Sequence, residues 1–186
     1  MESPIRHCIL GIALLVLAGG AFAGELAGRV VSVSDGDTVT VLDDAREQHK
    51  IRIAGIDAPE KRQAYGERAK QHLSDLVYGK NVVVVWDKRD RYGRLIGRVL
   101  VHECDRAACR YAIDAGLEQL KAGLAWHYKQ YEKEQKADER VRYSTTEAEA
   151  RARRDGLWRE PDAVPPWQFR HHSAVTPGPF ATITLR

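Results

Sequence analysis

The sequence predicts an α+β protein built around a small closed β-barrel of the OB type. Five short runs rich in Val and Ile are separated by turn residues, as expected for short strands. One segment between the third and fourth runs has helical spacing, and further helical segments follow the fifth run. This order of elements fits a five-stranded barrel with one helix inserted between its strands and other helices after them.

The first three predicted strands cover residues 26–33, 38–42 and 48–53. The stretch SDGD at 34–37 supplies the Asp-Gly pair that is favoured in tight hairpins, and LDDAREQ is expected to form the next turn. Gly55 is expected to break the third strand and begin a loop. The N-terminal third of the chain is therefore predicted to be a three-stranded meander.

The next predicted element is a helix at 65–78, in which small and aliphatic residues recur at helical spacing and which Gly79 ends. Two more strands are expected at 81–87 and 94–101, joined by the turn KRDRYG. These two strands complete the predicted set of five.

The C-terminal half is predicted to be helical. Asp114 is suited to cap a short helix that runs to Ala122. A long polar helix is expected at 138–154, ended by Gly156. After REPDAVPPW, the chain continues as a proline-containing tail that is not expected to form independent structure.

The N-terminus has the pattern of a secretory signal peptide. Arg6 and His7 form a short basic start, 9–17 is almost entirely apolar, and small residues stand at Ala21 and Ala23. The alternative is a membrane anchor, but the apolar stretch is shorter than the roughly 20 residues that span a bilayer. We expect cleavage after Ala23, export to the periplasm or the medium, and no stable membrane association afterwards.

The rest of the chain has the size of one compact domain, which we place at 24–160, with the tail at 161–186. The net charge is +3, from 29 basic and 26 acidic residues. This is not the strong basic excess of a protein that binds nucleic acid by bulk charge. A polyanion would have to bind at a local cluster of charged residues.

Two cysteines remain after the signal, Cys104 and Cys109, in the stretch HECDRAACRY. In an exported protein, two cysteines this close on a polar loop indicate a small disulfide. The alternative is a pair of free thiols, because sequence does not show whether the geometry of a disulfide is reached.

Three predicted turns and their flanking strands contain residues suited to phosphodiester hydrolysis. That reaction needs cations or forked donors for the negative charge on phosphorus oxygens, and a carboxylate that activates water. Carboxylates without His or Cys also favour calcium or magnesium over zinc. The residues are Asp35, Asp37, Arg52, Asp57, Glu60 and Arg94.

Each of these motifs alone has an ordinary structural interpretation. Asp-Gly-Asp is common in hairpins, Asp-Ala-Pro-Glu could end any strand, and Arg-Tyr-Gly-Arg could join two solvated strand ends. The sequence also leaves open whether the 34–37 turn and the 54–60 loop lie at the same end of the barrel. Nevertheless, unrelated turns would not be expected to supply a complete set.

The segments VSDGDTV (33–39), IRIAGIDAPE (51–60) and DRYGR (90–94) together resemble the signature segments of the staphylococcal nuclease family. Their order matches, as does the five-residue separation of the arginine and the aspartate in the second segment. GLAWHY at 123–128 and GLW at 156–158 resemble the C-terminal half of that family. The resemblance covers roughly 25–158, and the departures from it are the cysteine-containing loop and the tail.

This resemblance implies an OB-fold barrel with three helices and a Ca²⁺-dependent phosphodiesterase. Its substrates would be DNA and RNA, single-stranded by preference, and its products would have 3′-phosphorylated ends. The protein would act as a monomer.

The resemblance also implies roles for individual residues. Asp37 and Asp57 would bind Ca²⁺ together with the main-chain carbonyl of Ala58, and Asp35 would lie in the outer shell of the metal. Glu60 matches the proposed general base for the attacking water.

Arg52 and Arg94 match the pair that binds the scissile phosphate. Tyr92 and Tyr128 match tyrosines that pack near the bound nucleotide, although Tyr131 competes with Tyr128 for that position and either tyrosine could instead be a barrel-edge aromatic.

Two other functional classes are compatible with parts of the sequence. A non-catalytic OB module would bind single strands by stacking and a basic groove. An extracellular phosphate- or peptide-binding domain would explain the arginines but not the carboxylates. The complete set of carboxylates and arginines favours the enzyme.

Overall fold

The structure is a computed structural model that describes residues 24–105 and 108–175, with the backbone alone at 102–105, 108–112 and 172–175. The predicted signal peptide at 1–23 and the end of the tail at 176–186 lie outside the described residues. Within the described ranges, no helix is long and apolar enough to cross a membrane.

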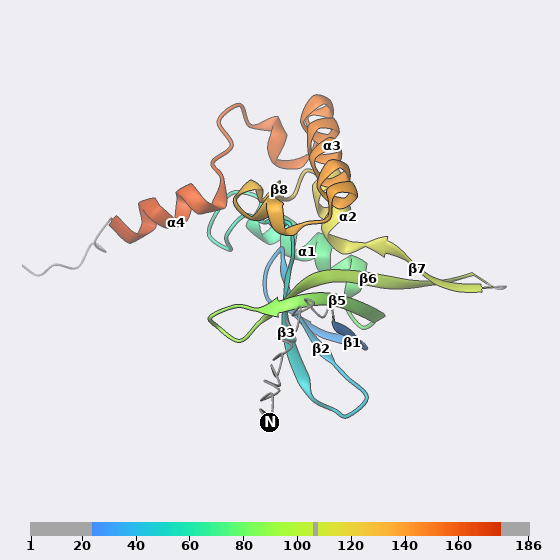
Figure 1. Ribbon diagram of the computed structural model, residues 1–186. Helices are drawn as coiled ribbons and strands as arrows, with labels where there is room; N and C mark the ends of the chain where they lie inside the picture. The colour runs from blue at the N-terminus through green and yellow to red at the C-terminus, as the bar shows by residue number, and fades with distance from the viewer. Residues whose placement is uncertain (1–23, 106–107, 176–186) are drawn as a thin grey trace, which may run out of the picture.

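The core of the structure is a closed five-stranded β-barrel (Figure 1). Its strands follow the order β3-β2-β1-β5-β6, and a parallel pairing of β3 with β6 closes it. Inward-facing residues such as Val39, Ile51 and Val84 are fully buried, so the interior is packed with aliphatic side chains. The strands are β1 (Gly24–Val33), β2 (Thr38–Leu42), β3 (Gln48–Ile53), β5 (Asn81–Arg89) and β6 (Leu95–Asp105).

Three helices pack on one side of this barrel, as predicted (Figure 1). They are α1 (Gly66–Val77), α2 (Ala115–Lys121) and α3 (Ala137–Arg153). Two short 3₁₀ helices flank α3, namely η1 (Lys129–Glu134) and η2 (Gly156–Arg159). The prediction of an α+β fold with a five-stranded OB-type barrel and three helices is thus confirmed.

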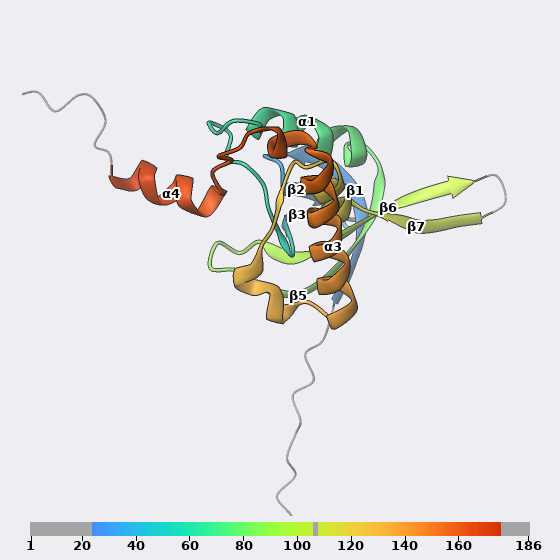
Figure 2. The same cartoon turned by 90° about the horizontal axis from the view of Figure 1, so that it is seen from above.

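The region of the two cysteines is a β-hairpin and not the predicted polar loop. β7 (Ala108–Asp114) pairs antiparallel with the end of β6, and the hairpin projects from the barrel (Figure 2). The register puts Cys104 directly opposite Cys109, and directly opposed positions have Cα separations that a disulfide can span. Both side chains lie outside the described residues, so the disulfide stays a prediction.

A second, two-residue ladder brings the C-terminal half of the chain to the end of β3. β4 (Ile56–Asp57) pairs with β8 (Trp126–His127), and the Tyr128 N–H donates to the Gly55 carbonyl at 2.9 Å. Gly55 has a φ of +75°, a left-handed conformation that glycine adopts without strain. The predicted break at Gly55 is confirmed, and it starts the turn that leads into β4.

The tail contains a further helix, α4 (Pro166–Val175), which sequence analysis did not expect. The helix does not stand alone, because Trp167 packs on β8 and its neighbour. The Trp167 ring is stacked on Tyr128 with centroids 5.7 Å apart, and its edge meets Trp126 at 6.4 Å. Figure 1 shows that the rest of α4 points away from the barrel.

One buried carboxylate joins three elements. Asp114 caps α2 as predicted, accepting hydrogen bonds from the Gly116 and Leu117 N–H groups. The same side chain accepts from the Tyr143 hydroxyl of α3 at 2.9 Å and pairs with the Arg98 guanidinium of β6 at 2.9 Å. Asp114 therefore ties the helices to the barrel.

We expect Asp114→Ala to lower the free energy of unfolding by about 3–5 kcal/mol, because the helix end and the Tyr143 hydroxyl lose their acceptor and the partly buried Arg98 keeps only its pair with Glu139. Asp114→Asn is the matched control, which keeps one oxygen for the cap and loses the charge and the second acceptor oxygen. Urea denaturation of both variants measures the difference. A loss below about 1 kcal/mol for the alanine variant would contradict this account.

Candidate functional site

The 34–37 turn and the loop after β3 meet at one end of the barrel. In the register of β2 and β3, Thr38 lies opposite Arg52. The Ile53 N–H donates to the Asp37 carbonyl at 2.8 Å, and the Ala58 N–H donates to Asp37 Oδ2 at 2.8 Å. The question that the sequence left open is thereby answered, since both acidic segments belong to one site.

Gly36 lets this turn approach helix α1 closely. A Cβ at this position would lie 2.6 Å from the Ala69 Cβ and 2.7 Å from the Ala58 Cβ, closer than such atoms pack. The Gly36 carbonyl accepts a hydrogen bond from the buried Gln119 amide at 2.6 Å. Gly36 has no positive φ, so packing against α1 explains this glycine better than the hairpin conformation that we expected.

The Arg52 guanidinium bridges two buried carboxylates. Its Nη1 is 3.0 Å from Asp37 Oδ2, and its Nη2 is 2.8 Å from Asp57 Oδ1. Nη1 also donates to the Ile56 carbonyl at 2.9 Å and to the Ile53 carbonyl at 3.1 Å. The predicted phosphate ligand is therefore paired with the predicted metal ligands in this structure.

Negative charge is in excess around Asp37. Burial raises the pKa of Asp37 to about 7; the Arg52 guanidinium opposes this shift, and the carboxylates of Asp35 and Asp57 add to it. Asp35 lies beside Asp37, since its Oδ1 accepts the Asp37 N–H at 3.1 Å. An additional cation at this end of the barrel would be electrostatically favourable.

The structure reveals a second arginine at the site, which sequence analysis missed. Arg170 of α4 places its Nη2 2.8 Å from Asp57 Oδ2 and its Nη1 2.7 Å from Glu60 Oε1. Asp57 is only 1% exposed, whereas the side chains of Glu60 and Arg170 are 39% and 44% exposed. The basic and aromatic residues of PPWQFRHH could have indicated a functional segment, but sequence spacing gives no link between this tail and Asp57.

Arg94 directly precedes β6, which pairs with the strand that contains Arg52. β3 and β6 pair with Ile51 opposite Leu95, and both of these residues are buried. Arg52 follows Ile51 and Arg94 precedes Leu95, so each arginine is next to this pair along its own chain segment. The Arg94 Nε is 2.7 Å from Asp90 Oδ2, which orients the guanidinium from within its own turn.

The three candidate tyrosines differ in their surroundings. Burial raises the pKa of Tyr128; the negative charge of Asp57 raises it further, and the Arg170 guanidinium opposes the shift. Tyr131 packs edge-on against Tyr128 and lies under the Lys88 ammonium, 5.5 Å from it. Tyr92 is 72% exposed, and the Arg94 guanidinium lies over its ring at 5.6 Å.

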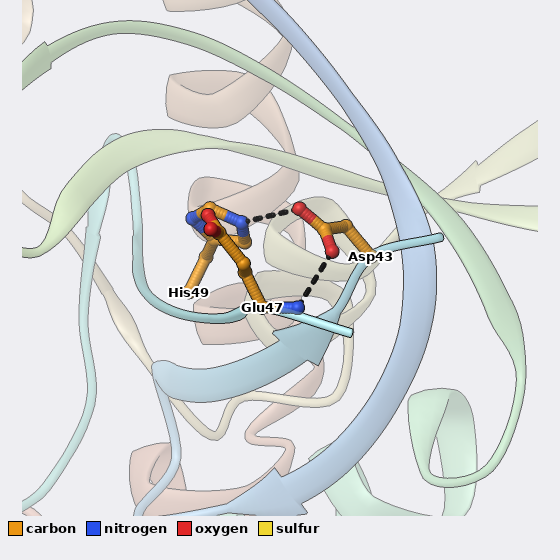
Figure 3. Close-up of side chains that lie close together, drawn as sticks. All are labelled: Asp43, Glu47 and His49. Atoms are coloured by element: carbon orange, nitrogen blue, oxygen red, sulfur yellow. Dashed lines mark hydrogen bonds and ion pairs between the residues drawn. The ribbon is translucent and has the colours of Figure 1, made fainter. Parts of the chain in front are cut away.

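Another group of side chains in the described part of the chain could bind a metal ion. Asp43, Glu47 and His49 have ligand atoms within 4.8 Å of one another at the β2–β3 turn (Figure 3). Asp43 accepts the Glu47 N–H at 2.8 Å, and its other oxygen is 2.8 Å from His49 Nε2. These bonds close the turn at the far end of β2 and β3 from Arg52, so we interpret the group as structural.

The site at Arg52 has the oxygen ligands that a hard divalent cation requires. Its side-chain oxygens come from carboxylates alone, and backbone carbonyls lie nearby, a combination suited to calcium or magnesium. The Arg170 guanidinium already occupies part of this position as a cation. Asp37 and Asp57 therefore fit the divalent ion that the sequence analysis implied, with Asp35 alongside and Glu60, the predicted base, paired to the same Arg170.

An OB-fold barrel with arginines and buried carboxylates at one end is the class of protein that these observations define. A profile described as "Staphylococcal nuclease homologue" matches residues 50–160. The chain is 41% identical over 162 residues to "Protein ParB" of Escherichia coli, covering 87% of this chain and 88% of that protein.

It is also 36% identical over 167 residues to "Micrococcal nuclease" of Shigella flexneri, covering 90% of this chain and 92% of that one. An "Uncharacterized endonuclease" of Escherichia coli O157:H7 is 36% identical over 160 residues, with 86% of this chain and 95% of that protein covered. The chain belongs to the staphylococcal nuclease family.

The raised pKa of Asp37 predicts a pH dependence of stability in the presence of a chelator. Between pH about 4 and about 7, the folded protein retains a proton on Asp37 that the unfolded chain has lost, so the free energy of unfolding falls as pH rises. Asp37→Asn removes this titration and should flatten the curve. Urea denaturation at several pH values measures it, and parallel curves for the two proteins would contradict the assignment.

Proposed function

We propose that this protein is an exported Ca²⁺-dependent phosphodiesterase that hydrolyses DNA and RNA and leaves 3′-phosphorylated ends. Membership of the staphylococcal nuclease family supports this proposal. So do the names of two relatives, "Micrococcal nuclease" and "Uncharacterized endonuclease". The observation that carries it is the Arg52 guanidinium between Asp37 and Asp57, with Glu60 beside them.

The arginines supply the donors for the phosphate. A guanidinium group donates two parallel hydrogen bonds to one phosphate, which a lysine cannot do. Arg94 directly precedes β6, the strand that pairs with the strand of Arg52, and Asp90 anchors it through its Nε. Arg52 donates to carboxylates in this structure and exchanges these partners for phosphate oxygens when substrate is bound.

The carboxylates divide into two roles according to their exposure. Asp37 and Asp57 are buried and would bind the calcium ion with the Ala58 carbonyl, while Asp35 supports the outer shell. When bound, calcium supplies positive charge that screens these carboxylates from the polyanionic substrate. Glu60 is 39% exposed, so water can reach it and transfer a proton to its carboxylate. The attacking water displaces the 5′ oxygen in line.

Two parts of the proposal depend on the sequence alone. Export to the periplasm or the medium rests on the signal-like residues 1–23. A monomer that prefers single-stranded substrate follows from the family resemblance, with Tyr92 and Tyr128 packing near the bound nucleotide.

Chelation of calcium tests the proposal directly. We expect purified protein to cleave denatured DNA in calcium, to lose cleavage on addition of EGTA, and to recover when calcium is restored, because the carboxylates would otherwise repel the substrate. Analysis of the ends should show 3′-phosphates. Unchanged cleavage in EGTA would rule out the metal role, and binding without cleavage would indicate the single-strand-binding module.

Arg94→Lys should reduce the rate of cleavage by roughly 10²-fold or more, because two aligned donors to the phosphate are lost. Arg91→Lys is the matched control, an exposed arginine of the same turn that should leave the rate unchanged. Steady-state assays on single-stranded DNA compare them, with circular dichroism to verify folding. Activity of the Arg94 variant within a few-fold of wild type would refute its role.

A further inference from the structure

Arg170 fully engages a carboxylate that the proposed function assigns to the metal. Its Nη2 is 2.8 Å from Asp57 Oδ2, and its Nη1 donates to Asp57 Oδ1 at 3.3 Å and to Glu60 Oε1 at 2.7 Å. Asp57 Oδ1 also accepts from Arg52 at 2.8 Å. Both oxygens of Asp57 thus accept hydrogen bonds from guanidinium groups.

The segment that contains Arg170 is anchored on both sides of the site. On one side, Trp167 stacks on Tyr128, with an angle of 20° between the rings. On the other, the Gln63 amide of the loop before α1 donates to the Val164 carbonyl. In Figure 1, the first turn of α4 lies nearest the barrel and the rest of the helix extends away from it.

Much of the segment is open to solvent, since Val164 is 46% exposed. Its residues Pro165 and Trp167 line a pocket of about 390 Å³ together with Trp126 and Tyr128. The Arg170 side chain is 44% exposed, so solvent screens its ion pairs and limits their strength. The segment also follows residue 160, where the match to the family profile ends.

Arg170 competes with a divalent cation for one oxygen of Asp57: Oδ1 also accepts from Arg52, whereas Oδ2 accepts from Arg170 at 2.8 Å. A calcium ligand must direct a lone pair at the ion, and the ion lies within about 2.6 Å of it. Arg170 uses these lone pairs for its own hydrogen bonds and also neutralises part of the charge that would attract the ion. Binding of calcium through Asp57 Oδ2 therefore requires Arg170 to leave, while Arg52 can stay on Oδ1.

We propose that residues 164–170 form an autoinhibitory latch, in which Arg170 occupies Asp57 and Glu60 and has to be displaced before calcium binds. This inference rests on the proposed function. The latch sets how much calcium the protein needs, because the closed fraction of molecules is not competent to bind the ion.

The test is the calcium affinity of Arg170→Ala, measured by isothermal titration calorimetry without nucleic acid. We expect calcium to bind roughly three- to tenfold more tightly than to wild type, as for a latch that is closed most of the time. Arg159→Ala is the matched control, because it removes the same charge from an exposed position in η2 and should leave the affinity unchanged. Trp167→Ala loosens the anchor and should tighten binding in the same direction.

Equal or weaker calcium binding by Arg170→Ala would overturn the latch. If the wild-type protein cleaves DNA in calcium while the affinity of this variant is unchanged, the latch alone fails and the proposed function stands. If neither protein binds calcium, the latch and the proposed metal fail together. Calcium binding by the variant and not by wild type would support the latch in its strongest form.

Discussion

One guanidinium group between two buried carboxylates organises the functional end of this barrel. Asp37 and Asp57 come from different segments, and two buried carboxylates this close would repel each other without a cation between them. Arg52 supplies that cation and also donates to two carbonyls of the loop that follows its strand. The same arginine therefore fixes the loop, the charge balance and the spacing of the carboxylates.

Elements from several parts of the domain contact this ion-pair cluster and hold it in place. Helix α1 packs against Gly36 and keeps the first acidic turn in place, and Gln119 of α2 donates to the same turn. β8 pairs with β4, with Trp126 opposite Asp57, and thereby fixes the backbone of Asp57. Because the pairs are drawn from distant parts of the chain, the site forms only when the barrel and its helices are assembled.

The structural elements that depend on neighbouring residues in the sequence were predicted most accurately. Alternating Val and Ile in the barrel strands, Asp114 as a cap and Gly55 as a break all depend on neighbouring residues, and each was found as expected. β7 was missed because its sequence lacks an apolar alternation. The contact of Arg170 with Asp57 could not be predicted, because it joins positions 113 residues apart and depends on a stack of Trp167 that only folding creates.

The position of Arg170 outside the segment shared with the family profile has an evolutionary consequence. If Arg170 acts as the proposed latch, changes in the tail alter the calcium concentration at which the site is accessible, while the residues of the barrel stay the same. Selection can thus adjust a regulatory threshold and a chemical step on separate stretches of one polypeptide. Relatives that keep the same barrel are free to differ in the surroundings to which they are tuned.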